Sequence, residues 1–127
     1  MDFTYQSRKD HLRIVVTGDF DARRAKVELG NIVRQSVTGG MSRILLDARA
    51  IPPGVSIADR YDLATKLADM APPTLRLAIL VAPGNLYTKT LEDTALNRGL
   101  KVRTTDSEAE ALEYLGLAPG PAASAAR

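Results

Sequence analysis

The sequence predicts a single α/β domain built around a mostly parallel sheet. Three observations support this. Two segments near the N-terminus alternate apolar and polar residues as strands do, and strand and helix patterns then alternate along the rest of the chain. Two of the later strand patterns are continuous apolar runs. Continuous apolar runs are typical of strands covered on both faces, as in parallel sheets. The expected order is ββαβαβαβα, with five strands, an N-terminal antiparallel hairpin and about four flanking helices.

The first two strands are expected at residues 3–7 and 11–17. Both segments alternate apolar and polar side chains, which is the pattern of a half-buried strand, and a short polar stretch at 8–10 separates them. The two runs therefore predict a β-hairpin.

The first helix is expected to begin at Asp21, whose carboxylate can cap the first turn, and to end at Gly39-Gly40. Its apolar positions recur at helical spacing: Ala22, Ala25, Leu29, Ile32 and Val33. Gly30 lies inside this helix at a cost of roughly 1 kcal/mol relative to alanine. A close contact between helix and sheet would explain it.

Residues 42–47 predict a buried strand, and the loop 48–55 leads from it to a second helix capped by Ser56. Asp59 lies in the first turn of this helix, where the helix dipole favours a negative charge. The expected apolar stripe is formed by Ile57, Tyr61, Ala64, Leu67, Ala68 and Ala71. Two prolines at 72–73 end the helix.

Residues 75–82 form the most apolar run and predict the central strand. A third helix is expected from Tyr87 through Leu91 and Ala95 to the turn at 97–99, followed by a short strand at 100–104. A last helix opens at 105–108 with capping-box spacing. The domain spans 1–117, and the low-complexity tail 118–127 is expected to be flexible.

The composition excludes several classes of function. The 127 residues contain no cysteine and one histidine, which rules out a disulfide framework, a thiol nucleophile and a two-histidine metal site within one chain. The net charge of +2 produces only a weak electrostatic field. The basic residues are also not interleaved with aromatic residues, so nucleic acid is not an expected partner. Without a signal peptide or a membrane-length apolar run, the sequence predicts a cytoplasmic protein. No cofactor is expected, and the carboxylates Asp47 and Asp59, which come from separate elements, are too weak a signal to predict a metal site.

Ligands of open α/β sheets bind beyond the carboxyl ends of the strands. The loops expected at that edge carry five polar candidates for a binding site: Arg49, Ser56, Arg60, Asn85 and Tyr87. Each also has a structural interpretation, because Ser56 suits a helix cap, the tyrosine suits a helical stripe and the two arginines suit a solvated rim. Neither a nucleophile elbow nor a phosphate-binding glycine loop is present, so no catalytic residue is assigned.

Several segments together resemble a known family. They are RILLDAR at 43–49 with SIADRY at 56–61, LRLAILV at 75–81, and NRGLKVR at 97–103 with AEALEYL at 109–115. These look like the small bacterial SpoIIAA-like proteins of STAS/SEC14 type. The resemblance implies a helix-flanked sheet, self-association in some members, and either regulation through protein partners or binding of apolar ligands. The resemblance also makes Ser56 the nearest counterpart of the serine that is phosphorylated in anti-sigma factor antagonists of the wider STAS group. The aspartate and glycine that flank that serine are not in place around Ser56.

Two functions follow as hypotheses. The first is a non-catalytic regulatory module that acts through a protein partner or as a homo-oligomer, with phosphorylation of Ser56 as its switch. The second is a carrier or sensor of a small apolar, lipid-like ligand. The second and third helices would swing apart from the sheet to admit this ligand between Tyr61, Leu63, Leu67, Tyr87 and Leu91.

Overall fold

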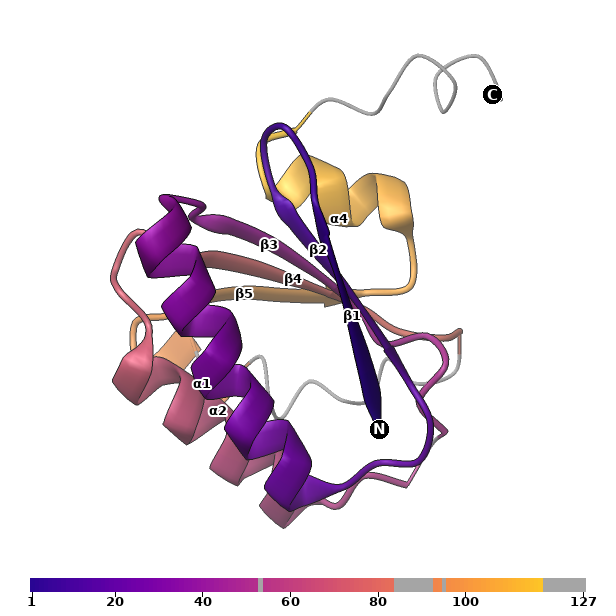
Figure 1. The fold of residues 1–127 in the computed structure, drawn as a ribbon. Helices are drawn as coiled ribbons and strands as arrows, with labels where there is room; N and C mark the ends of the chain where they lie inside the picture. The colour runs from indigo at the N-terminus through magenta and orange to yellow at the C-terminus, as the bar shows by residue number, and fades with distance from the viewer. Residues whose placement is uncertain (53, 84–92, 95, 118–127) are drawn as a thin grey trace.

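The fold is a five-stranded mixed sheet with helices on both faces (Figure 1). It is taken from a computed structural model that describes residues 1–52, 54–83, 93–94 and 96–117. The strands lie side by side in chain order: β1 (Asp2–Ser7), β2 (Leu12–Thr17), β3 (Arg43–Asp47), β4 (Arg76–Leu80) and β5 (Lys101–Thr105). β1 pairs with β2 antiparallel and every other pair is parallel, which confirms the predicted hairpin and parallel sheet.

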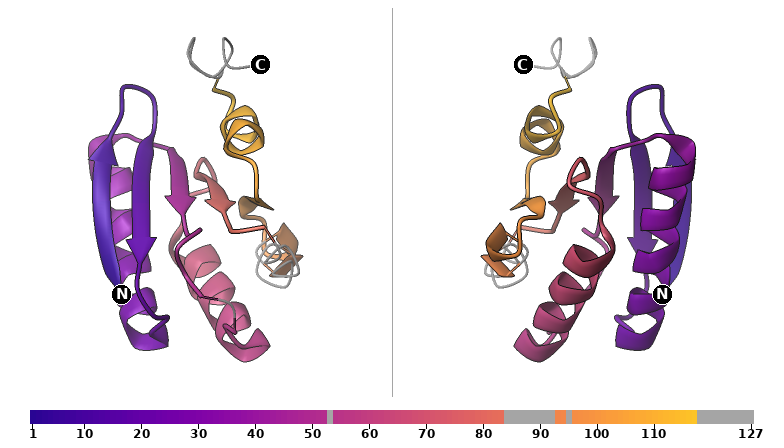
Figure 2. Two further views of the ribbon diagram at one scale, coloured as in Figure 1. Left: turned by 90° about the vertical axis from the view of Figure 1, so that its right-hand side faces the viewer. Right: turned by 90° about the vertical axis from the view of Figure 1, so that its left-hand side faces the viewer.

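Three helices are described in full: α1 (Ala22–Gly39), α2 (Ile57–Met70) and α4 (Glu108–Tyr114). Figure 2 shows α1 and α2 on one face of the sheet and α4 on the other. Most of the helix expected around 87–95 lies outside the described residues, although positions 93–94 and 96–97 are helical. The tail 118–127 also lies outside them. No helix within the described part of the chain is long and apolar enough to cross a membrane.

Two apolar cores explain the patterns read from the sequence. In β3, Ile44 packs into the core beneath α1 and α2, whereas Leu45 packs into the smaller core beneath α4. Consecutive residues of a strand point to opposite faces, so a strand covered on both sides must be apolar at every position. β2 alternates because only its Leu12, Ile14 and Val16 face is buried in a core.

The starts of α1 and α2 are capped by the residues that the sequence predicted, whereas α4 is capped by Ser107, which accepts a hydrogen bond from the Glu110 backbone N–H at 3.2 Å, and not by Thr105 of the predicted capping box. Asp21 accepts a hydrogen bond from the Arg24 backbone N–H at 3.1 Å, and Gly40 closes α1 in the left-handed region at φ 67°. The explanation expected for Gly30 is wrong, because it faces α2 rather than the sheet. A Cβ built there would meet the Met70 sulfur of α2 at 3.9 Å, which is an ordinary contact.

Candidate functional site

The carboxyl ends of β2 to β5 meet at one edge of the sheet, where the connecting loops begin. Backbone hydrogen bonds tie this edge together. The Ala48 N–H donates to the Leu80 carbonyl at 2.8 Å, and the Val81 N–H donates to the Thr105 carbonyl at 2.9 Å. From this braced edge, the loop 48–56 runs to the start of α2 and determines where that helix begins.

Arg49 takes part in an ion network on the α4 side of the sheet. Its Nε donates to Asp47 Oδ1 at 2.9 Å and its Nη2 donates to Asp47 Oδ2 at 2.7 Å, a bidentate contact. Arg13 of β2 reaches the same carboxylate at 3.1 Å and also reaches Glu108 of α4 at 2.9 Å. The network joins two strands to a helix, which is a structural role for Arg49.

The network shifts the pKa values of Asp47 and Arg49. Hydrogen bonds from Arg49 hold the pKa of Asp47 below its ordinary value, and the charge of Arg13 adds to this effect. In return, the hydrogen bond to Asp47 raises the pKa of Arg49. Asp47 is only 7% exposed, so its negative charge is stable there because cationic donors surround it.

Ser56 is the N-cap of α2, as predicted. Its side chain accepts a hydrogen bond from the Asp59 backbone N–H at 3.1 Å, while the residue as a whole remains exposed. The hydroxyl thus satisfies one of the unpaired N–H groups of the first helical turn. An exposed serine at a helix start is both a structural cap and a site that another protein can reach.

Arg60 does not lie on the solvated rim that its structural interpretation supposed. It is 6% exposed in the first turn of α2. The buried residues of this helix are Arg60, Leu63, Ala64 and Leu67, a complete set of positions i, i+3, i+4 and i+7. The buried face is therefore rotated relative to the expected stripe.

The same rotation exposes two residues that were expected to face the core. Ile57 is 68% exposed and Tyr61 is 48% exposed, one helical turn apart. Arg98 donates to the Tyr61 hydroxyl at 3.4 Å from the segment before β5. We call Ser56, Ile57, Tyr61 and Arg98 the helix-start surface.

Of the five predicted site residues, the three that the structure describes have separate surroundings. Arg49 is held by the ion network, whereas Ser56 and Arg60 belong to the start of α2. Asn85 and Tyr87 lie outside the described residues. Among the residues that the structure describes, no group of three or more histidine or acidic side chains is placed to hold a metal ion.

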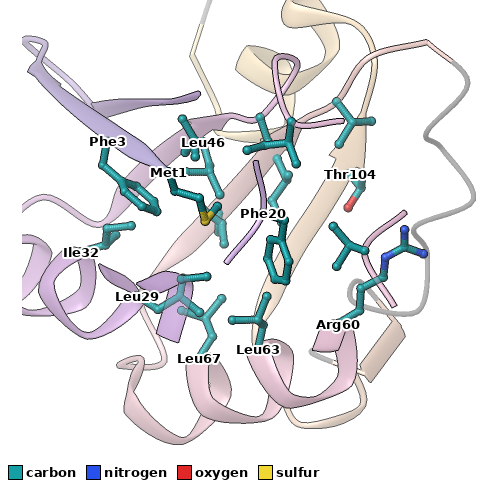
Figure 3. A pocket seen from close by; sticks show the side chains of 18 of the residues that line it. Met1, Phe3, Phe20, Leu29, Ile32, Leu46, Arg60, Leu63, Leu67 and Thr104 are labelled. Atoms are coloured by element: carbon teal, nitrogen blue, oxygen red, sulfur yellow. The ribbon is translucent and has the colours of Figure 1, made fainter. Parts of the chain in front are cut away.

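An apolar pocket of about 150 Å³ lies between the sheet and helices α1 and α2 (Figure 3). Its wall includes Phe20 and Ala25, the residue before the Asp21 cap and the fourth residue of α1. An apolar residue before the cap that packs against the fourth helical residue is called a hydrophobic staple. The spacing of Phe20 and Ala25 is therefore a local sequence signal for this part of the pocket wall. The other lining residues come from strands and helices that are distant in the sequence, so the sequence pattern does not predict that they meet.

Of the residues expected to hold a lipid-like ligand, Leu63 and Leu67 line this pocket and Tyr61 is exposed. Tyr87 and Leu91 lie outside the described residues. The pocket lies between the sheet and helices α1 and α2, and most of the expected third helix lies outside the described residues. The lipid-like ligand stays a prediction.

Comparison with solved structures finds similar folds at low sequence identity, among them two anti-sigma factor antagonists. One is the crystal structure of an anti-sigma factor antagonist from Mycobacterium paratuberculosis, with a TM-score of 0.64 and 12% identity over 91% of this chain and 93% of that one. The other is the anti-sigma factor antagonist SpoIIAA in its unphosphorylated form, with a TM-score of 0.56 and 13% identity over 93% and 100% of the two chains. No family model and no curated protein sequence matches. The chain therefore has the mixed-sheet α/β fold found in SpoIIAA and in the mycobacterial anti-sigma factor antagonist.

Proposed function

We propose that this protein is a non-catalytic regulatory module that binds a protein partner through the helix-start surface. The observation that carries the proposal is the exposure of Ile57 and Tyr61 on consecutive turns of α2. A large apolar side chain that is two-thirds exposed gains free energy when a partner covers it. Tyrosine and arginine, both present on this surface, are enriched where proteins bind one another.

The fold supports an anti-sigma factor as the class of partner, because two solved structures with a similar fold are described as anti-sigma factor antagonists. Such an interaction needs no catalytic group, and the sequence offers none. Self-association remains a second mode of action for the same module and stays a prediction.

The test is a binding measurement with the anti-sigma factors encoded by the source organism, using isothermal titration calorimetry. Ile57→Asp is expected to weaken binding at least tenfold, because a charge would then have to be buried at the centre of the contact. The substitution leaves α2 intact, since Ile57 is its first residue and a negative charge at a helix start is favourable.

Val27→Asp on α1 is the matched control. Val27 is 57% exposed, comparable with Ile57, but it lies on the other helix. It is expected to bind the partner as the unmodified protein does. Equal losses in the two variants, or no anti-sigma factor that binds, would contradict the proposal.

Phosphorylation of Ser56 is proposed as the switch of this surface. A phosphate would add about two negative charges directly beside Ile57, at a helix start that tolerates them. The helix would stay folded while the apolar contact surface acquired charge, so partner binding is expected to fall. Mass spectrometry of protein from the native host tests the modification, and Ser56 unmodified under all growth conditions would exclude the switch.

A further inference from the structure

The pocket between the sheet and the two long helices extends across the whole width of the sheet. Phe3 of β1 lines one end and Thr104 of β5 lines the other, and these are the two outer strands. The roof is made by α1 and α2, with Leu29 and Leu63 among its residues. The segment between β3 and α2 completes the wall through the side chains of Ala48, Ile51, Pro52 and Val55.

The lining is apolar apart from two side chains, Arg60 and Thr104. In Figure 3 these two lie on the same side of the pocket, opposite Phe3 and Ile32. The pocket therefore has an apolar end and an end that carries hydrogen-bonding groups. This arrangement is typical of small-molecule sites, where a few polar groups orient a mostly apolar ligand.

Thr104 carries a hydroxyl that the fold does not use. Its Oγ1 atom is buried and has no hydrogen-bond partner within the described protein. The next residue, Thr105, shows the usual outcome, because its hydroxyl accepts a hydrogen bond from the Ser107 backbone N–H at 3.1 Å. A buried polar atom without a partner is unfavourable, and a ligand that supplies a hydrogen bond removes that cost.

The size of the pocket limits the occupant. An apolar protein cavity of about 150 Å³ lined by aliphatic and aromatic side chains accepts a benzene-sized molecule. We propose that this pocket binds a compact, neutral molecule with one aromatic ring and one hydrogen-bonding group, which pairs with the Thr104 hydroxyl. The proposal does not depend on the helix-start surface, since it concerns other side chains and another kind of ligand.

The test uses two probes that differ by one hydroxyl, p-cresol and toluene, titrated into the full chain and followed by amide chemical shifts in NMR. Both are expected to bind and to shift residues around the pocket. p-Cresol is expected to bind roughly three- to tenfold more tightly, which is the net contribution of one neutral hydrogen bond. No shift with either probe at millimolar concentration would overturn the proposal.

Thr104→Val tests the hydrogen bond, because valine keeps the shape of threonine without the hydroxyl. In this variant p-cresol is expected to bind only as tightly as toluene, with the affinity for toluene unchanged. Thr65→Val on α2 is the matched control: its buried hydroxyl also lacks a partner among the described residues, and Thr65 does not line the pocket. A preference for p-cresol that survives Thr104→Val would refute the assigned hydrogen bond.

Ala25→Leu tests the location, because the added carbons reduce the space beside α1. Both probes are expected to lose at least tenfold in affinity. Val55→Phe, on the loop wall, provides a second obstruction if the first variant does not fold. Binding that persists in a folded variant of this pair would place the probes elsewhere and overturn the proposal.

Discussion

Replacing Asp47 with asparagine tests the ion network at the carboxyl edge of the sheet. The Asp47 carboxylate receives three side-chain N–H donors, from Arg13 at 3.1 Å and from Arg49 at 2.9 Å and 2.7 Å. Asparagine keeps the shape but not the charge, and its amide group presents N–H donors to the guanidinium groups. The substitution therefore weakens every contact of this side chain while leaving the packing unchanged.

The structure sets the size of the effect. Removing one partner of a fully buried ion pair costs about 3–5 kcal/mol. Here the cost is smaller, because the Arg49 side chain is 45% exposed and regains water, and Arg13 keeps Glu108. We expect Asp47→Asn to lower the free energy of unfolding by about 2 kcal/mol, roughly the value of one hydrogen bond to a charged group.

Urea denaturation at neutral pH measures this loss, which corresponds to a midpoint shift of roughly 1 M. Glu110→Gln is the matched control, since it removes a carboxylate charge from an exposed contact, 3.4 Å from Arg103. Exposed ion pairs contribute about 0–1 kcal/mol, so the control is expected to unfold almost as the unmodified protein does.

The pH dependence gives a second check on the same reasoning. The folded pKa of Asp47 lies below the ordinary 3.8, so the unfolded carboxyl takes up protons first as the pH falls. The contribution of Asp47 is fully present above pH 3.8 and is lost as the pH falls through the folded pKa. The difference between Asp47→Asn and the unmodified protein should therefore vanish in strong acid. A difference that stays constant with pH, or is absent at neutral pH, would refute the assigned network.

Two further substitutions test local features of the helices. Ser56→Ala removes the cap of α2 and should lower the free energy of unfolding by about 1 kcal/mol, whereas Ser56→Asp keeps an acceptor and should leave it almost unchanged, as thermal denaturation would show. Gly30→Ala should raise the free energy of unfolding by up to about 1 kcal/mol, because the new Cβ meets Met70 at an ordinary distance and the unfolded chain loses freedom. A lower melting temperature in Gly30→Ala would show that α1 and α2 pack more tightly than the structure indicates.

Most of the fold could be predicted because each strand and helix carries a local signal. Alternation in β2 and continuous apolar runs in β3 and β4 follow from covering one or two faces of the sheet. The caps Asp21 and Ser56 are local in the same sense, since each bonds to a backbone N–H three residues later.

The candidate site was less predictable because it depends on packing between distant segments. Helical spacing predicts Ile57 and Tyr61 on the buried side of α2 and Arg60 in solvent, whereas Arg60 is buried and the other two are exposed. The contact of Arg13 with Glu108 joins residues 95 positions apart, and only the strand order brings them together. The spacing of apolar residues along the sequence does not predict such long-range ion pairs.

The loop 48–55 belongs to two sites at once. It forms part of the pocket wall and leads directly into Ser56 and Ile57 on the helix-start surface. A molecule that shifts this loop would alter the affinity for a protein partner, and thermodynamic reciprocity then requires the partner to alter the affinity for that molecule by the same factor. One short connection thus provides a route by which a metabolite-sized compound and a regulatory protein could sense each other without sharing a single contact.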